Sequence, residues 1–71
     1  MPYANFKIPA GTLTQKQKAQ IITRTTDLYV EIYGERARAT TLVLVEEVPE
    51  GGWGIGGHVL TVAEIQQLSD N

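Results

Sequence analysis

Pro2, which follows the initiator methionine, is the residue of this sequence best suited to do chemistry. Proline belongs to the small residues after which that methionine is normally removed, and removal would leave Pro2 with a free secondary amine. An α-amine has a pKa of roughly 7.7–8.0, and an apolar pocket lowers it because burial disfavours the cation. A rigid ring amine near neutrality is a competent general base. The alternative interpretation is that Pro2 simply begins an edge strand, where no ladder donor is needed.

Other groups that could attack a substrate or hold a metal are scarce. His58 is the only imidazole and the chain has no cysteine, which excludes a zinc finger and disulfides. We interpret His58 as a surface or interface residue, with proton transfer as the alternative. The segment from Gly52 to Gly57 satisfies G-x-G-x-x-G, but a dinucleotide site also needs a following helix and strand, and only fourteen residues remain. We therefore predict a hairpin there and no metal or organic cofactor.

The hydrophobic pattern predicts a strand, a helix and a second strand that would position Pro2. Residues 3–8 alternate between polar and apolar side chains, as a strand does. A capping-box sequence at residues 14–17 opens a helix whose apolar residues recur at helical spacing up to Tyr33, and Gly34 is the expected stop. Residues 40–45 are β-branched and almost continuously apolar, which suits a parallel strand covered on both faces. The prediction is an α+β fold built on a βαβ unit.

The last third of the chain predicts a glycine-rich hairpin and a short helix. Residues 48–57 hold five of the seven glycines, and this flexible backbone around Trp53 is typical of a tight hairpin whose large side chains dock elsewhere. Residues 61–64 repeat the capping-box pattern and open the short helix. We expect a single domain over residues 1–71, frayed at its end.

A chain of 71 residues with two main strands and one main helix is too small to cover both faces of a strand. Below ~70–80 residues a core usually needs disulfides, a metal or further subunits. The sequence offers no cysteines and no set of metal ligands. We therefore predict that further copies of the chain supply the missing layer.

Charge and hydropathy set further limits. Six Lys and Arg against eight Asp and Glu give a net charge of −2, so no basic field attracts nucleic acid. All six bases lie in residues 1–38, whereas residues 39–71 carry five acids and no base, which indicates an ordinary solvated surface or complementary packing between subunits. No apolar run approaches the ~20 residues of a membrane span, and the start lacks a signal-peptide pattern. We expect no membrane contact and a cytoplasmic location.

Several motifs, in order and spacing, resemble the 4-oxalocrotonate tautomerase family over about residues 2–57. They are Met1-Pro2-Tyr3, the helix start at residues 14–18, the strand end at residues 45–48, and the run Trp53-Gly54-Ile55-Gly56-Gly57. The resemblance implies a βαβ protomer assembled as a hexamer, with a dimer or trimer as alternatives. It also implies that Pro2 is the general base of an isomerase for enol–keto tautomerisation, a 1,3- or 1,5-proton transfer in a small enol or keto acid, without a cofactor.

The resemblance also assigns residues to substrate binding. Trp53 falls where the family places an aromatic residue that lines the apolar pocket, although an inter-subunit contact is the simpler interpretation. Two arginines of the family, which bind the substrate carboxylate and polarise its carbonyl, are replaced here by Thr12 and Leu42. Neither a hydroxyl nor an alkyl group replaces a bidentate arginine, so we do not expect a dicarboxylate substrate.

Other side chains could take over the role of the missing arginines. Arg36 and Arg38, just before the second main strand, either reach the site of a neighbouring subunit or lie in a solvated loop. Tyr3 and Lys7, on the polar face of the first strand, are further candidates for stabilising the substrate oxygen.

Two other functions remain compatible with the sequence. The chain could be a non-catalytic assembly or binding subunit that keeps the fold of the family but has lost its carboxylate-binding arginines. It could also be a lyase or dehalogenase that adds water with the proline as acid, for which Glu46 or Glu47 would supply the carboxylate. If Met1 is retained, Pro2 has no basic nitrogen and the chain is expected to be inactive.

Overall fold

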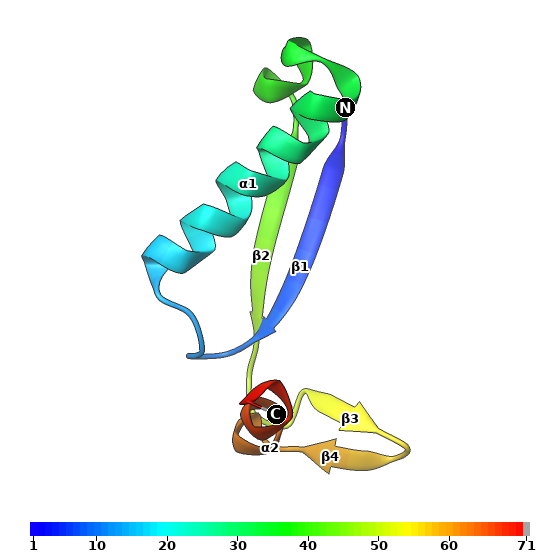
Figure 1. The fold of residues 1–71 in the computed structure, drawn as a ribbon. Coiled ribbons are helices and arrows are strands. Elements are labelled where there is room, and N and C mark those ends of the chain that lie inside the picture. The colour runs from blue at the N-terminus through cyan, green and yellow to red at the C-terminus, as the bar shows by residue number, and fades with distance from the viewer. Residues whose placement is uncertain (71) are drawn as a thin grey trace.

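The computed structural model describes residues 1–70, and the elements follow the predicted order (Figure 1). They are β1 (Tyr3–Pro9), α1 (Gln15–Tyr33), the 3-10 helix η1 (Glu35–Ala39), β2 (Leu42–Val48), β3 (Trp53–Ile55), β4 (His58–Leu60) and α2 (Val62–Asp70). Asn71, the last residue of the predicted domain, lies outside the described residues. No helix among residues 1–70 combines the length and apolar character needed to cross a membrane.

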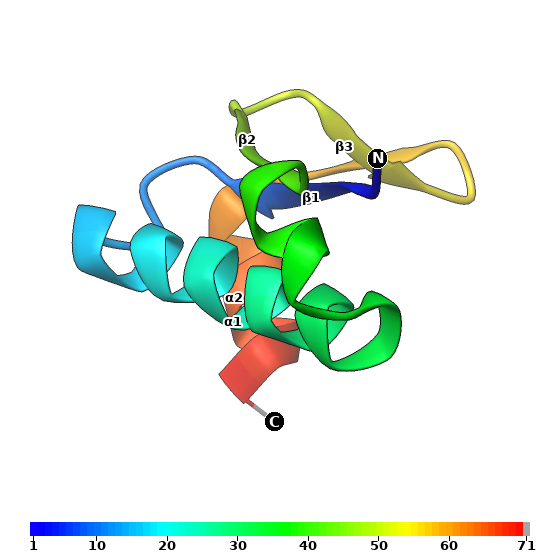
Figure 2. The same ribbon diagram turned by 90° about the horizontal axis from the view of Figure 1, so that it is seen from above.

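The first four elements form the predicted βαβ unit. β1 and β2 pair in parallel, with Tyr3 opposite Leu42 and Pro9 opposite Val48. α1 crosses one side of this two-stranded sheet, as the view from above shows (Figure 2). The predicted capping box is confirmed, because the Gln17 amide donates to the Thr14 hydroxyl at 3.2 Å while the Gln17 side chain accepts from the Thr14 amide at 2.9 Å. These reciprocal bonds satisfy two of the free amides at the helix start.

The connection between α1 and β2 differs from the expectation. Gly34 ends the helix as predicted, but its φ of 103° and ψ of 166° are not those of the left-handed helical cap; they lie in a region that favours glycine. The short helix η1 then follows, which the sequence pattern did not predict. The amides of Thr40 and Thr41 donate to the Ala37 carbonyl at 3.1 and 2.9 Å. Because these bonds hold both threonines in a turn, β2 begins only at Leu42.

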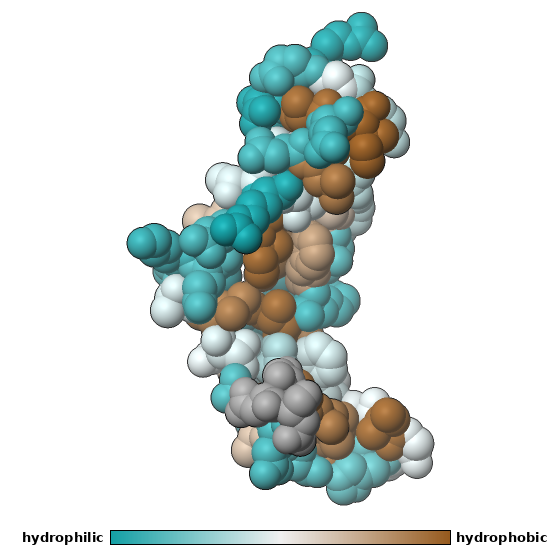
Figure 3. All heavy atoms as spheres, in the orientation of Figure 1, coloured by the Kyte–Doolittle hydropathy of each residue, from teal (hydrophilic) through white to brown (hydrophobic). Residues whose placement is uncertain are grey.

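A single chain leaves one face of the sheet uncovered. Val43 and Val45 of β2 are half-buried beneath α1, whereas the alternate residues Leu42 and Leu44 are 49% and 39% exposed on the opposite face. Tyr3 of β1 shares that open face and is 58% exposed. Apolar side chains therefore lie at the surface along the molecule, shown in brown in Figure 3. The double coverage expected of β2 is absent from the isolated chain.

The hairpin of β3 and β4 and the helix α2 lie at the opposite end of the chain from the N-terminus (Figure 1). The predicted hairpin is confirmed, with Trp53 opposite Leu60 in an antiparallel pair, and Gly56 and Gly57 supply the positive φ angles of its tight turn. The second capping box is confirmed at the start of α2 by reciprocal bonds between residues 61 and 64. The outward side chains of this unit, among them Ile55, are left exposed.

We predict that the fold depends on self-association through the open face. Each buried leucine contributes about 1.5–3 kcal/mol relative to an exposed one, and this chain buries almost none on its own. The melting temperature is expected to fall on about 100-fold dilution, because association stabilises by mass action. Leu44→Lys should shift the assembly towards smaller species in sedimentation velocity.

Gln20→Lys, which adds the same charge at an exposed position of α1, is the matched control. A monomer whose melting temperature does not change with concentration would contradict this prediction.

Candidate active site

A hollow of about 260 Å³ lies where the start of β1 meets the end of α1 and η1. Six residues line it: Met1, Pro2, Tyr33, Arg36, Ala37 and Thr40. We refer to it as the Pro2 hollow. It brings together two of the residues singled out from the sequence, the proline of the proposed base and one of the two arginines before β2.

The parallel ladder fixes the position of Pro2. Its carbonyl accepts a hydrogen bond from the Leu42 amide at 3.0 Å, directly before the pairing of Tyr3 with Leu42. Proline is tolerated here because the first position of a strand needs no donor. Met1 precedes it and is 86% exposed. Removing Met1 would therefore free the ring nitrogen and take away one of the residues that line the hollow.

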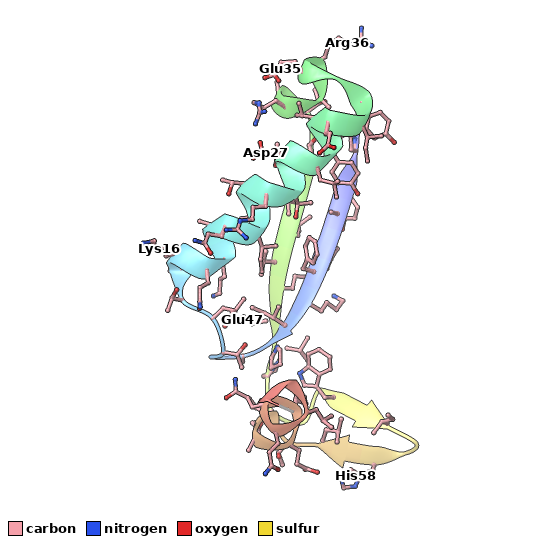
Figure 4. All side chains as sticks on the ribbon, in the orientation of Figure 1. Lys16, Asp27, Glu35, Arg36, Glu47 and His58 are labelled. Carbon is pink, nitrogen blue, oxygen red and sulfur yellow. The ribbon has the colours of Figure 1, made fainter. Side chains whose placement is uncertain are left out.

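The turn of η1 positions Arg36. Ala37, the one buried residue in the described part of the chain, anchors this turn with 7% of its surface exposed. Besides the two amides described above, the carbonyl of Ala37 accepts the Thr41 hydroxyl at 2.7 Å. The Arg36 side chain is exposed at the end of the molecule (Figure 4) and has no hydrogen bond or ion pair with residues 1–70. Its guanidinium is therefore available to an anion.

Arg38 lies on the same turn in a different environment. Its Nε donates to Glu35 at 2.8 Å and its guanidinium donates to Asp27 of α1 at 2.9 Å. These bonds raise the pKa of the Arg38 guanidinium and tie η1 to α1. Arg38 does not line the Pro2 hollow. Within one chain its charge is already balanced by two carboxylates.

The other predicted site residues lie elsewhere in the isolated chain. Trp53 begins β3, is half-buried, and donates its indole N–H to the Val48 carbonyl at 3.4 Å. Tyr3 lies on the open face, where its hydroxyl accepts from the Asn5 side chain at 3.3 Å. Lys7 pairs with Glu46 at 3.1 Å. None of these side chains lines the Pro2 hollow of the isolated chain.

The two carboxylates considered for water addition are held away from Pro2 by bonds of their own. Glu46 accepts from Asn5 and Lys7. Glu47 accepts from the Gly11 amide at 3.0 Å and pairs with Lys18 of α1. These contacts lower the pKa of both carboxyl groups, which keeps them ionised at neutral pH. Both lie toward the end of β2, whereas Pro2 bonds to its first residue.

Sequence reasoning assigned Tyr33 to the apolar stripe of the helix and Thr40 to a strand, and did not associate either with Pro2. Tyr33 is 65% exposed in the last turn of α1, with its ring 6.1 Å from that of Tyr29. The signal that could have found it is its position directly before the helix-ending Gly34, where the chain turns back toward the start of the sheet. Among the described residues, no three His, Asp or Glu side chains gather into a cluster that could hold a metal ion.

Comparisons with known proteins identify the family and the fold of the chain. A family model described as "Tautomerase enzyme" matches residues 2–63. A probable tautomerase K2 of Dickeya dadantii is 41% identical over 61 residues, which cover 86% of this chain and 90% of that protein. The crystal structure of DmpI from Helicobacter pylori is 32% identical, with a TM-score of 0.70 over 93% of this chain and 97% of that one.

A structure among the 4-oxalocrotonate tautomerase isozymes of Methylibium petroleiphilum is similar to the same degree. It is 28% identical, with a TM-score of 0.70 over 90% of this chain and 97% of that one. The fold and these matches define a tautomerase-type protein. The chain belongs to the tautomerase family and, within it, to the group of the 4-oxalocrotonate tautomerases.

We predict that Ala37 anchors the turn of η1 that lines the Pro2 hollow. Ala37→Leu forces extra carbons into a buried position, and such overpacking costs about 1–3 kcal/mol. Urea unfolding at fixed protein concentration should show this loss. Ala39→Leu, at an exposed position of the same turn, is the matched control and should change stability little. Equal effects of the two variants would show that Ala37 does not anchor the turn.

Proposed function

We propose that this protein is a cofactor-independent isomerase that catalyses enol–keto tautomerisation of a small enol or keto acid. Its general base is the secondary amine of Pro2, exposed by removal of Met1. The single observation that carries this proposal is that Pro2 and an unpaired cation, Arg36, line the same hollow. Membership of the tautomerase family supports the reaction class.

The proposed step is a proton transfer without a change of oxidation state. The Pro2 nitrogen takes the proton from the enol hydroxyl, and the oxygen lone pair forms the carbonyl. The carbon–carbon double bond then takes the same proton from the prolinium, at the adjacent carbon for a 1,3-transfer or at the end of the conjugated system for a 1,5-transfer. The amine returns to its basic form, so the cycle needs no other reactant.

The reaction requires Pro2 to be uncharged near neutrality, and two features of one chain act in opposite directions. The C-terminal end of α1, which faces the hollow through Tyr33, carries a partial negative charge that favours the protonated amine. The positive charge of Arg36 in the same hollow disfavours it. An apolar side chain that covers the Pro2 amine would shift this balance towards the uncharged amine. The indole of Trp53 from an adjoining copy is our candidate for that side chain.

This proposal includes a homo-oligomer, with a hexamer as the expected form. The open face of the sheet and the exposed residues of the hairpin support it, because both leave large apolar side chains without a partner in the isolated chain. The hairpin lies at the opposite end of the chain from Pro2 (Figure 1). A contribution of Trp53 to the site is therefore possible only between subunits.

A non-catalytic assembly subunit is the second candidate. It is favoured by the side chains at Thr12 and Leu42, which carry no charge, and by the engagement of Arg38 with two carboxylates. Under this alternative the oligomer forms as described but the Pro2 hollow binds no enol. The two candidates therefore differ in activity and agree in assembly.

We predict that protein whose first residue is Pro2, verified by mass spectrometry, accelerates the ketonisation of phenylenolpyruvate. Insertion of Ala before Pro2 turns its nitrogen into an amide, and kcat should fall by about 10²–10⁴, the range of a general base. The inserted protein should keep its oligomeric state in sedimentation, which makes it the control for folding. A processed, assembled protein that is inert towards several enol acids would exclude the isomerase and favour the assembly subunit.

The pH dependence provides a separate prediction. Since the base acts in its unprotonated form, kcat/KM should rise with pH and level off above the pKa of the free amine. We expect that pKa to lie below the roughly 7.7–8.0 of an unperturbed α-amine, because apolar cover and Arg36 both disfavour the cation. A titration of the processed protein by rate measurements from acid to alkaline pH tests this. A midpoint above the unperturbed value would mean that the amine is not covered.

A further inference from the structure

We infer that the Pro2 hollow selects acids with a single carboxylate on a flat apolar body, and that Arg36 binds that carboxylate. This inference rests on the proposed function, because it names the substrate class of the same site. Its basis is a comparison, among the described residues, of the Lys and Arg side chains that form ion pairs with the one in the hollow that forms none.

Only one cationic side chain lines the Pro2 hollow, and it is that of Arg36. Three of the other five bases are engaged in ion pairs: Lys7 with Glu46, Lys18 with Glu47, and Arg38 with Asp27 and Glu35. The last two, Lys16 and Arg24, lie in the first turn and at the middle of α1, whereas the hollow lies at the end of that helix. No acidic residue lines the hollow. It therefore offers a binding charge for one anionic group.

The free state of Arg36 makes it the better anion ligand of the two arginines on this turn. Binding a carboxylate to Arg38 would require it to give up bonds of 2.8 and 2.9 Å to two carboxylates. Arg36 has no such partner among residues 1–70. A guanidinium binds a carboxylate with two parallel hydrogen bonds, which also orients the bound acid.

The remaining walls suit an uncharged, flat body. They are the ring of Pro2, the ring of Tyr33, the methyl group of Ala37 and the side chain of Thr40, with Met1 leaving on processing. An aromatic ring can pack against that of Tyr33. A second carboxylate placed among these groups would lose its water without gaining a cation, which is costly.

The test compares ligands that differ by one carboxylate. Cinnamate, 4-methylcinnamate and 4-carboxycinnamate share one body and cannot tautomerise, so calorimetric titration of the processed protein reports binding alone. We expect cinnamate and its methyl derivative to bind similarly and the dicarboxylate at least about tenfold more weakly. Equal or tighter binding of 4-carboxycinnamate would overturn the inference.

Three variants test whether Arg36 binds the carboxylate. Arg36→Gln should weaken cinnamate binding at least about tenfold, and Arg36→Lys, which keeps the charge without the bidentate geometry, should fall between the two. Arg24→Gln removes an exposed arginine of α1 and should bind as the parent does. Sedimentation and circular dichroism check that each variant is assembled and folded. Unchanged binding by Arg36→Gln would overturn the inference, as would an equal loss in Arg24→Gln.

Kinetics separates failure of this inference from failure of the proposed function. In Arg36→Gln we expect the KM for phenylenolpyruvate to rise more than kcat falls, because Arg36 binds the acid and Pro2 moves the proton. Binding of cinnamate through Arg36 without any turnover would refute the isomerase and leave the inference standing. Turnover of phenylenolpyruvate with unchanged KM in Arg36→Gln would refute the inference and leave the isomerase standing.

Discussion

Because two strands and one helix make only two layers, this chain leaves one face of its sheet bare, and the other features of the molecule follow from that geometry. Val43 and Val45 are half-buried beneath α1, but Leu42 and Leu44 on the other face are exposed. Ala37 is the one buried residue in the described part of the chain, and it lies in a turn rather than in a central core. In the proposed assembly, a second layer supplied by other copies would have two functions: it would stabilise the fold, and it would provide walls that a single chain lacks.

The same constraint explains where a proline base can be placed. The start of β1 is a strand position that needs no amide donor, and the Pro2 carbonyl still bonds to Leu42, so the ring is held without its nitrogen being used. Pro2 lines a hollow whose other walls come from the end of α1 and from η1. Burying an amine there lowers its basicity only when water is excluded. Assembly and basicity are therefore coupled in the proposed mechanism.

Periodicity and capping motifs were sufficient to predict the regular elements. The spacing of apolar residues and the reciprocal bonding pattern of Thr14 and Gln17 placed α1 correctly, and the glycines of the hairpin turn placed β3 and β4. The helix η1 was missed because five residues are too few to show a period. The hollow was missed for a related reason: Tyr33 and Thr40 meet Pro2 only through this turn, and each had an adequate local explanation in a helix or a strand.

The sequence could not distinguish Arg36 from Arg38, and the geometry of a 3-10 helix explains why the structure does. With about three residues per turn, positions three apart eclipse one another while neighbouring positions point about 120° apart. Glu35 and Arg38 are three apart and form an ion pair, which Asp27 of α1 completes. Arg36 is instead one of the residues that line the Pro2 hollow, and it forms no ion pair with either carboxylate. The ion pairs of Arg38 with two carboxylates thus tie η1 to α1. Arg36, on the same turn, stays unpaired within the described part of the chain, beside the proposed base.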